Sequence, residues 1–230
     1  MRAVRCHDLI GPAGLRVDAL NEPEPGPGEV LVETRAAGVN FPDVLLSYGK
    51  YQFKPQPPFV PGGEAAGVVK AVGWGVTRCA VGDRVVAMVM HGAFAEQIVV
   101  PEQSVVKLPD AVGFEVGAAT LVTYVTTWHA LVDRAHLAPG ETLLVLGAAG
   151  GTGIAAVQIG KLLGARVIAA ASSDEKVAFC RAQGADEGIQ YTREDLKARV
   201  KELTRGDGVN VVYDPVGGRY AEQALRGIAW

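Results

Sequence analysis

Apolar and polar residues follow different periods in the two halves of the chain. In the first half, residues 29–39 (EVLVETRAAGV) alternate, and residues 65–89 contain two apolar runs separated by Val-Gly-Asp. Residues 92–101 (GAFAEQIVVP) continue this pattern. A period of two residues, interrupted by Gly and Pro, predicts strands joined by turns. The first half is therefore predicted to be a small β-barrel.

The pattern changes near residue 110, where residues 113–137 show apolar positions at helical spacing. From Thr142 onward, apolar runs and amphipathic stretches alternate, which predicts a parallel sheet covered by helices. The predicted strands and helices, in chain order, are Leu143–Leu146, Gly153–Leu163, Arg166–Ala171, Asp174–Gln183, Asp186–Gln190, Arg193–Thr204 and Val209–Tyr213. We place the domain boundary between residues 1–124 and residues 125–230.

Composition excludes several classes of protein. Of the 230 residues, 49% are hydrophobic and 20% are charged, which favours a packed core over disorder. The net charge of −3 disfavours nucleic acid as a partner, because there is no basic surplus to neutralise phosphates. The uncharged stretch Thr142–Gly160 is long enough to suggest a membrane span, but its five glycines favour strand, turn and helix. We expect no membrane partner, and residues 1–14 lack the apolar core of a signal peptide.

The three cysteines, Cys6, Cys79 and Cys180, are far apart in the sequence, and no C-x-x-C motif occurs. This pattern supports neither a disulfide framework nor a zinc finger. It fits the reducing cytoplasm, where we expect the protein to be located. Each cysteine is predicted to be a small buried hydrophobic residue.

A glycine cluster follows the first apolar run of the second half. The fingerprint G-x-G-x-x-G is present in the form Ala148-x-Gly150-x-x-Gly153, with Gly151 and Thr152 between the two glycines. A glycine turn at the start of a helix brings free N–H groups close to a phosphate, so this turn predicts dinucleotide binding. The alternative is a tight strand–helix turn without a ligand.

The second strand of the half ends in Ser172 and Ser173, where an NAD-selective site usually has Asp or Glu. A carboxylate there would repel a 2′-phosphate, whereas serine hydroxyls and the nearby Lys176 would accommodate it. This favours NADPH over NADH as the cofactor. The alternatives are that Ser172-x-x-Glu175 is a capping box and that Lys176 is only solvated.

Several motifs together resemble one known family. In chain order they are AAGVNFPDVL, PFVPGGEAAGVV, VGDRV, GAFAEQIVV, LVLGAAGGTGIAAVQIGKLLGARVI and DPVGG. The chain is similar over essentially its whole length to the medium-chain dehydrogenase/reductase superfamily, and most of all to the quinone oxidoreductase branch that contains zeta-crystallin. The resemblance implies a GroES-like barrel that carries the substrate, followed by a Rossmann domain that carries NADPH.

The resemblance also implies that the protein holds no metal. Zinc-dependent members have a cysteine ligand at the position of Asn40 and a histidine ligand at the position of Gly63, just before Glu64. The four-cysteine structural lobe of those members is absent too. A zinc-free reductase must stabilise the developing oxyanion with hydrogen-bond donors instead.

In the resembled family, Asn40 lies beside the nicotinamide, Asp43 lies nearby and Tyr51 lines the substrate cleft. The implied roles are that Asn40 orients the reacting groups, Tyr51 donates a hydrogen bond or proton to the substrate, and Asp43 supports this arrangement. The alternatives are a loop-capping Asn40, a turn-forming Asp43 and a core Tyr51. Leu45 occupies the position of a second tyrosine found in many members, which makes the pocket more apolar.

Four residues match cofactor contacts of the family: Thr126, Ser172, Lys176 and Tyr191. The alternative for Tyr191 is packing at a strand end. The family's chains continue well past the position of residue 230, so the resemblance implies a Rossmann sheet truncated at its C-terminal side, without strands five and six of the usual six. We therefore expect this chain to bind NADPH weakly, to turn over quinone poorly or not at all, and to aggregate. The family usually dimerises through strand six, so a homodimer is expected for a longer form and is doubtful for these residues.

The sequence thus predicts a zinc-independent oxidoreductase that transfers a hydride from NADPH to a quinone or a related conjugated carbonyl, its small-molecule partner. One alternative is an enoyl-thioester reductase, which uses similar parts. The other is a non-catalytic relative that binds NADPH or RNA, although the acidic net charge counts against RNA.

Overall fold

A computed structural model describes all residues from 1 to 230. The chain divides into two compact units, Met1–Val122 and Thr123–Trp230. The sequence-based boundary lay after residue 124. The structure places the division inside a π-helical segment, η3 (Leu121–Val125), which belongs to the stretch predicted as helical.

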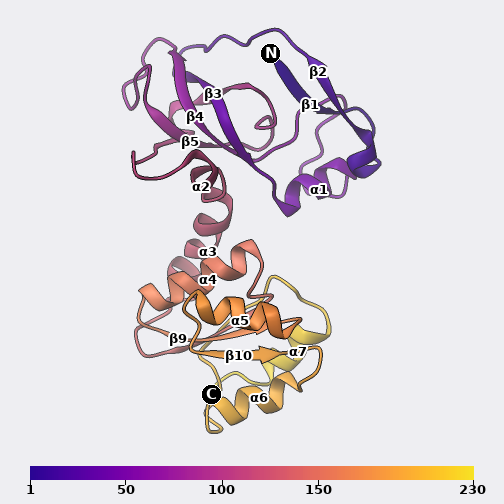
Figure 1. Cartoon of the computed structure of the whole chain (residues 1–230), viewed down its shortest axis with the longest axis vertical. Helices are drawn as coiled ribbons and strands as arrows, with labels where there is room; N and C mark the ends of the chain where they lie inside the picture. Colours follow the sequence, from indigo (N-terminus) through magenta and orange to yellow (C-terminus); the bar gives the residue numbers. More distant parts are fainter. The chain divides into compact units, whose positions relative to one another are not determined.

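The first unit is built on antiparallel strands (Figure 1). Its larger sheet has five strands in the order β6-β3-β4-β5-β7, and β1 pairs with β2 in a separate ribbon. In chain order the elements are β1 (Arg2–Cys6), η1 (Gly11–Gly14), β2 (Leu15–Ala19), β3 (Glu29–Gly38), α1 (Phe41–Ser47), β4 (Glu64–Val72), β5 (Arg84–Met88), β6 (Gln97–Pro101), η2 (Glu102–Ser104), β7 (Val105–Lys107) and α2 (Phe114–Ala118).

Alternate residues of the strands in the first unit face one core cluster, although Leu31 and Ala66, which lie between them, are buried as well. Val30 and Val32 of β3 are buried against Ala65 and Val69 of β4 and Val85 of β5. The pairing of β3 with β4 shifts register twice, between Leu31 and Val32 and between Thr34 and Ala36. Such bulges bend a strand and increase its twist. They precede the end of β3, where the chain turns into α1.

The second unit is a parallel sheet in the order β10-β9-β8-β11. This is the order 3-2-1-4 of a doubly wound fold, in agreement with the predicted class. In chain order the elements after η3 are α3 (Thr126–Trp128), η4 (His129–Arg134), β8 (Thr142–Leu146), α4 (Gly151–Leu162), β9 (Arg166–Ala171), α5 (Asp174–Ala182), β10 (Glu187–Gln190), α6 (Leu196–Leu203), β11 (Val211–Tyr213) and α7 (Arg219–Leu225).

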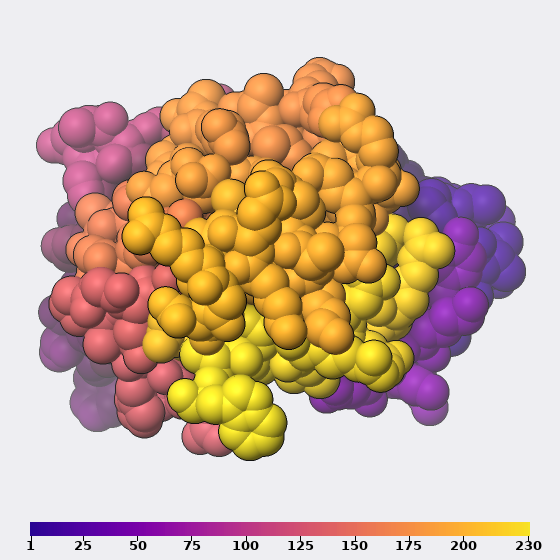
Figure 2. Space-filling view, turned by 90° about the horizontal axis from the view of Figure 1, so that it is seen from below, coloured from indigo at the N-terminus to yellow at the C-terminus, as the bar shows by residue number.

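Helices cover both faces of this sheet. Leu143 and Val145 of β8 pack in one cluster with residues of α4 and α5, whereas Leu144 and Leu146 pack in another with residues of α6 and α7. Figure 1 shows α4 and α5 on one side of the sheet and α6 on the other. The space-filling view shows α6, α7 and the C-terminal residues, in gold and yellow, as the outer surface of this side (Figure 2).

Three predicted starts were wrong by two or three residues, and the first of them is that of α4, which begins at Gly151, not at Gly153. Helix α6 begins at Leu196, not at Arg193, because the Asp195 side chain accepts a hydrogen bond from the backbone N–H of Ala198 at 2.8 Å and caps the helix there. The last strand begins at Val211, not at Val209. The uncharged stretch 142–160 forms β8, a turn and most of α4. None of the helices combines the length and the apolar character that crossing a membrane requires.

We expect Leu143→Ala to lower the free energy of unfolding by about 2–5 kcal/mol, because it would leave a cavity between β8 and α4. Leu143 is fully buried (0% exposed), whereas Leu162 at the end of α4 is 84% exposed. Leu162→Ala is therefore the control and should change stability by less than about 0.5 kcal/mol. Urea denaturation followed by circular dichroism measures both values. Equal effects of the two substitutions would contradict the packing of Leu143 between β8 and α4.

Candidate functional site

The glycine turn joins β8 to α4 in the second unit. Gly147 has a φ of +57°, and its carbonyl oxygen accepts a hydrogen bond from the N–H of Gly150 at 2.9 Å. A Cβ at Gly153 would lie 2.4 Å from the Gly147 oxygen and 2.7 Å from the Cα of Ala148. Only glycine at 153 therefore lets the first turn of α4 pack so closely on the loop.

Gly147 was not predicted to belong to the fingerprint, because the first fingerprint position was assigned to Ala148. The structure shows Ala148 fully buried, and the left-handed conformation is adopted by the residue before it. The position of Gly147 directly after an apolar strand could have identified it as the residue that makes the turn. The sharp turn that the fingerprint needs is thus present in this chain, one residue earlier than predicted.

The turn is open where a phosphate would approach. A Cβ at Gly150 would meet only the Gly147 oxygen, at 3.3 Å. The N–H groups of Gly151, Thr152 and Gly153 lie in the first turn of α4, where an α-helix offers them no partner within the helix. Free N–H groups and the helix dipole at the N-terminus of this 12-residue helix are the features that suit an anion.

A neighbouring helical segment holds the turn in place. Thr127 is fully buried, and its hydroxyl donates to the carbonyl oxygen of Thr152 at 3.2 Å. The same hydroxyl lies 3.2 Å from the Tyr213 hydroxyl at the end of β11. Thr126, which the sequence analysis chose, is exposed beside it. The Thr-Thr pair was visible in the sequence, but only the packing of α3 against α4 shows which threonine contacts the turn.

A second polar corner follows β9. Ser173 is the N-cap of α5 and accepts a hydrogen bond from the backbone N–H of Lys176 at 3.3 Å. The Lys176 ammonium donates to the Ser172 hydroxyl at 3.1 Å. The capping box considered for Ser172 and Glu175 is therefore not formed, since the cap is one residue later. This leaves two hydroxyls and one cation together at the end of the strand.

The loop after β10 closes the same corner. The Tyr191 N–H donates to the Ala171 oxygen at 3.1 Å, and the Thr192 hydroxyl donates to the Ser172 oxygen at 3.2 Å. Arg193 makes two hydrogen bonds, of 2.9 and 3.0 Å, to the Asp174 carboxylate. The ring of Tyr191 lies 4.4 Å from that of Tyr220, as the packing alternative predicted. Arg193 was not predicted as a site residue, because residues 193–204 were predicted to form a helix.

The first unit contains the other group of predicted residues. Asn40 lies at the N-cap of α1, and its backbone N–H donates to Asp43 Oδ2 at 2.7 Å. Asp43 Oδ1 accepts from the N–H of Gly62 at 3.2 Å. Burial raises the pKa of the Asp43 carboxyl, while the hydrogen bonds from Asn40 and Gly62 lower it. Asp43 thus joins the start of α1 to the loop before β4.

The Asn40 side chain contacts a residue that the sequence analysis did not select. Its Nδ2 donates to Glu64 Oε1 at 2.8 Å, and Glu64 Oε2 accepts from the N–H of Val122 at 2.9 Å. Tyr51 is partly buried and packs against a small cluster of Cys6, Leu46 and Phe59. The structure brings Asn40 and Asp43 together and places the body of Tyr51 on a core cluster.

The residues that could bind metal are dispersed. The structure has no group of three or more His, Cys, Asp or Glu side chains that could hold a metal ion. The three cysteines are free, and burial raises the pKa of each thiol. Raised thiol pKa values disfavour the thiolate, which is the form that binds metals and attacks electrophiles.

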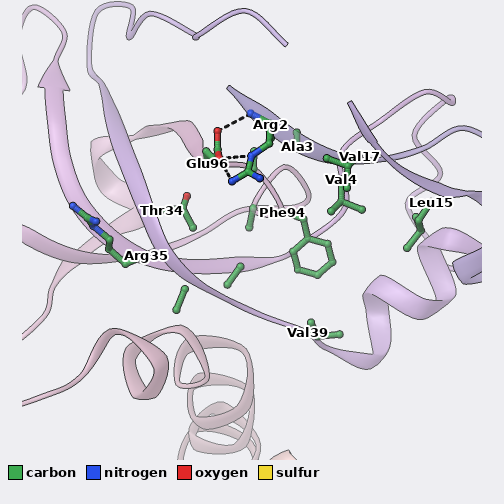
Figure 3. A pocket seen from close by; sticks show the side chains of 14 residues that line it. Arg2, Ala3, Val4, Leu15, Val17, Thr34, Arg35, Val39, Phe94 and Glu96 are labelled. Atoms are coloured by element: carbon green, nitrogen blue, oxygen red, sulfur yellow. Dashed lines mark hydrogen bonds and ion pairs between the residues drawn. The ribbon is translucent and has the colours of Figure 1, made fainter. Parts of the chain in front are cut away.

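A groove of about 670 Å³ lies elsewhere in the first unit (Figure 3). It is formed by β1, β2, the second half of β3 and residues 93–96. The ion pair between Arg2 and Glu96 lies at one side, and Phe94 and Val39 are on other walls. Asn40, Asp43 and Tyr51 are not among its lining residues, although Val39, which directly precedes Asn40, is.

Comparison with known proteins identifies relatives of both units. Residues 26–110 match the alcohol dehydrogenase GroES-like domain, and residues 151–229 match the zinc-binding dehydrogenase domain. These matches, with the two observed sheets, confirm the predicted combination of a GroES-like unit and a Rossmann-type unit.

Individual relatives are similar over nearly the whole chain. A quinone oxidoreductase-like protein 2 homolog of Nematostella vectensis is 42% identical over 100% of this chain and 63% of its own length. A quinone oxidoreductase of Pseudomonas aeruginosa is 43% identical over 95% of this chain and 67% of its own length. The solved Escherichia coli quinone oxidoreductase, complexed with NADPH, is 35% identical with a TM-score of 0.94, covering 99% of this chain and 70% of that one. The chain thus spans less than two thirds of the first of these relatives.

We expect substitutions at two glycines of the turn to have different effects. Gly153→Ala should lower the free energy of unfolding by about 1–3 kcal/mol, because the new Cβ would overlap backbone atoms. Gly150→Ala should leave stability nearly unchanged, since its φ of −81° suits alanine. It should instead weaken NADPH binding at least about tenfold by covering the surface that a phosphate approaches.

Chemical denaturation and fluorescence titration with NADPH separate the two effects. If Gly150→Ala destabilised the protein as much as Gly153→Ala does, the turn would have only a structural role.

Proposed function

Because the chain belongs to the medium-chain dehydrogenase/reductase superfamily, in its quinone oxidoreductase-like branch, we propose that it acts in transferring a hydride from NADPH to a quinone or a related conjugated carbonyl. One observation carries the proposal. The anion-binding turn and the corner with Ser172 and Lys176 follow β8 and β9, which are neighbouring parallel strands. Their carboxyl ends lie at one edge of the sheet, as a dinucleotide site requires.

The residues of the second unit fit NADPH. The N–H groups at the start of α4 suit the pyrophosphate, and Gly150 permits its close approach. The hydroxyls of Ser172 and Ser173 and the ammonium of Lys176 suit a 2′-phosphate. Asp174 would repel that phosphate, but its carboxylate is neutralised by Arg193. The corner therefore favours NADPH over NADH.

NADPH supplies the hydride when it is bound, and the protein must orient the reactants and stabilise the oxygen that gains charge. We assign the orienting role to Asn40, whose side chain and backbone are both held by carboxylates. Asp43 supports it from inside α1. Tyr51 is the candidate hydrogen-bond donor to the acceptor oxygen, with its ring anchored on the core cluster and its hydroxyl as the polar group.

The proposed reaction uses no zinc. Asn40 and Gly63 occupy the two positions at which zinc-dependent members of the superfamily have ligands, and neither side chain can replace a thiolate or an imidazole. Hydrogen-bond donors then polarise the acceptor. The free cysteines support a reducing location such as the cytoplasm. The only partner that we propose is the small-molecule acceptor.

Cofactor preference tests the assignment of the serine corner. We expect NADPH to bind at least about tenfold more tightly than NADH, which is about 1.4 kcal/mol. Lys176→Ala should weaken NADPH binding and leave NADH binding nearly unchanged, because it removes only the cation for the 2′-phosphate. Lys201→Ala, on the far helix α6, is the control and should change neither affinity. Equal affinities of the parent protein for the two cofactors would refute the preference.

Turnover tests the reaction itself. The purified protein should oxidise NADPH slowly when a simple quinone is added, and Asn40→Ala should lower kcat more than it lowers NADPH affinity. Asn21→Ala, in an exposed loop, is the matched control and should have parent activity. Absorbance at the NADPH band measures the rate with a panel of acceptors. Turnover of an enoyl thioester without turnover of quinones would replace our proposal by the enoyl-thioester reductase alternative.

A further inference from the structure

Glu64 is a buried carboxylate without a cationic partner. It is the first residue of β4 and is 1% exposed, and no Lys, Arg or His forms an ion pair with it. It accepts hydrogen bonds from two neutral donors, Asn40 Nδ2 and the N–H of Val122. Burying a carboxyl group opposes folding unless hydrogen bonds compensate it, and an apolar side chain would fill this space at lower cost. A role other than stability is therefore indicated.

The surrounding backbone is shaped to admit this carboxylate. A Cβ at Gly38, which pairs with Glu64 across the sheet, would lie 2.4 Å from Glu64 Oε1 and 2.3 Å from the Ala118 oxygen. Only glycine at the end of β3 leaves room for the Glu64 side chain to reach Asn40. The contact is thus built into the strand pair and does not depend on a flexible surface chain.

Asn40 Nδ2 is the amide atom that donates to Glu64 Oε1, so the NH₂ end of the Asn40 amide faces Glu64 and Oδ1 is on the other side. The two ends of an amide are otherwise distinguished only by such networks. The main chain of Asn40 is also restrained, since its N–H donates to Asp43 Oδ2 and its carbonyl oxygen accepts from the N–H of Asp43 at 3.0 Å.

We propose that Glu64 is a positioning residue that sets the orientation of the Asn40 carboxamide. It holds Nδ2 and so keeps Oδ1 on the other side, where it takes part in the capping box with the N–H of Asp43 and has a second lone pair as an acceptor for an N–H or O–H donor of the bound reactants. Through its second oxygen it ties this orientation to the backbone at Val122, in η3. The effect on turnover rests on the proposed function, whereas the amide orientation does not.

Exchanging the carboxylate and the amide tests this geometry. In Glu64→Gln, the oxygen of the new amide can still accept from Val122, which leaves its NH₂ group facing position 40. The Asn40 amide must then turn over, so that Oδ1 accepts from this group and Nδ2 is released to the other side. Asn40→Asp alone places two carboxylates side by side. In the double variant Asn40→Asp with Glu64→Gln, the new amide at position 64 can donate to the new carboxylate at position 40, while the amide oxygen accepts from Val122. The exchange should therefore remove the repulsion that Asn40→Asp alone creates.

The primary measurement is hydrogen exchange of the asparagine side-chain amides by NMR on ¹⁵N-labelled protein. The parent Asn40 amide should exchange at least about tenfold more slowly than that of exposed Asn21, and Glu64→Gln should abolish this protection. Glu33→Gln on β3 makes the same chemical change at an exposed carboxylate and should preserve it. Unchanged protection in Glu64→Gln would overturn the proposal.

Thermal unfolding and kinetics provide the second measurement. The Tm of the double variant should exceed the value expected from adding the two single effects. Such non-additivity is the sign of a direct interaction between the two side chains. The Tm of the double variant can be measured even if one single variant is barely folded. Glu64→Gln should lower kcat about tenfold while the KM for NADPH changes less than about threefold. Additive single effects would overturn the proposal. Absence of quinone turnover in the parent protein would instead contradict the proposed function, and amide exchange would still decide the role of Glu64.

Discussion

Burial of β8 on both faces is the constraint on which the second unit depends. Successive residues of the strand, from Leu143 to Leu146, pack alternately against the α4–α5 layer and the α6–α7 layer, and all four are fully buried. A strand covered on both sides has no place for polar side chains. Polar chemistry must therefore begin where the strand ends, at the turn of Gly147 to Gly150. The position of the anion site is a consequence of the core.

The same logic explains the neighbouring corner. β9 is apolar and buried as far as Ala171, and Ser172 is the first residue after it that is partly exposed. From there, short hydrogen bonds connect three separate segments: the end of β9, the start of α5 and the loop after β10. Arg193 lies opposite Asp174 and pairs with its carboxylate, so the Lys176 ammonium and the serine hydroxyls are not opposed by that carboxylate. Local charge, more than the net charge of −3, suits this place to an anion.

The first unit solves a different problem, because its polar groups are buried. Asp43 and Glu64 both lie inside, and both are satisfied by neutral N–H donors and not by cations. Each carboxylate joins two segments that are distant in sequence. Asn40 takes part in both sets of bonds, which leaves its amide with little freedom. Preorganisation of this kind is what a group that orients a reactant needs.

The sequence by itself determined the two kinds of architecture, the strand–helix order of the second half, the glycine turn and the serine corner. Each of these depends on residue type at short spacing, through hydrophobic period, glycine flexibility or capping. Tertiary structure alone decided which of two adjacent residues has a given structural role. Gly147 and not Ala148 makes the sharp turn, Thr127 and not Thr126 contacts the turn, and Ser173 and not Ser172 caps α5. It also revealed Glu64 and Arg193 as partners of Asn40 and Asp174, which are 24 and 19 residues away in the chain. A hydrogen bond or ion pair extends over only a few ångströms, so such partners are chosen by the folding of distant strands against one another and not by any pattern along the chain.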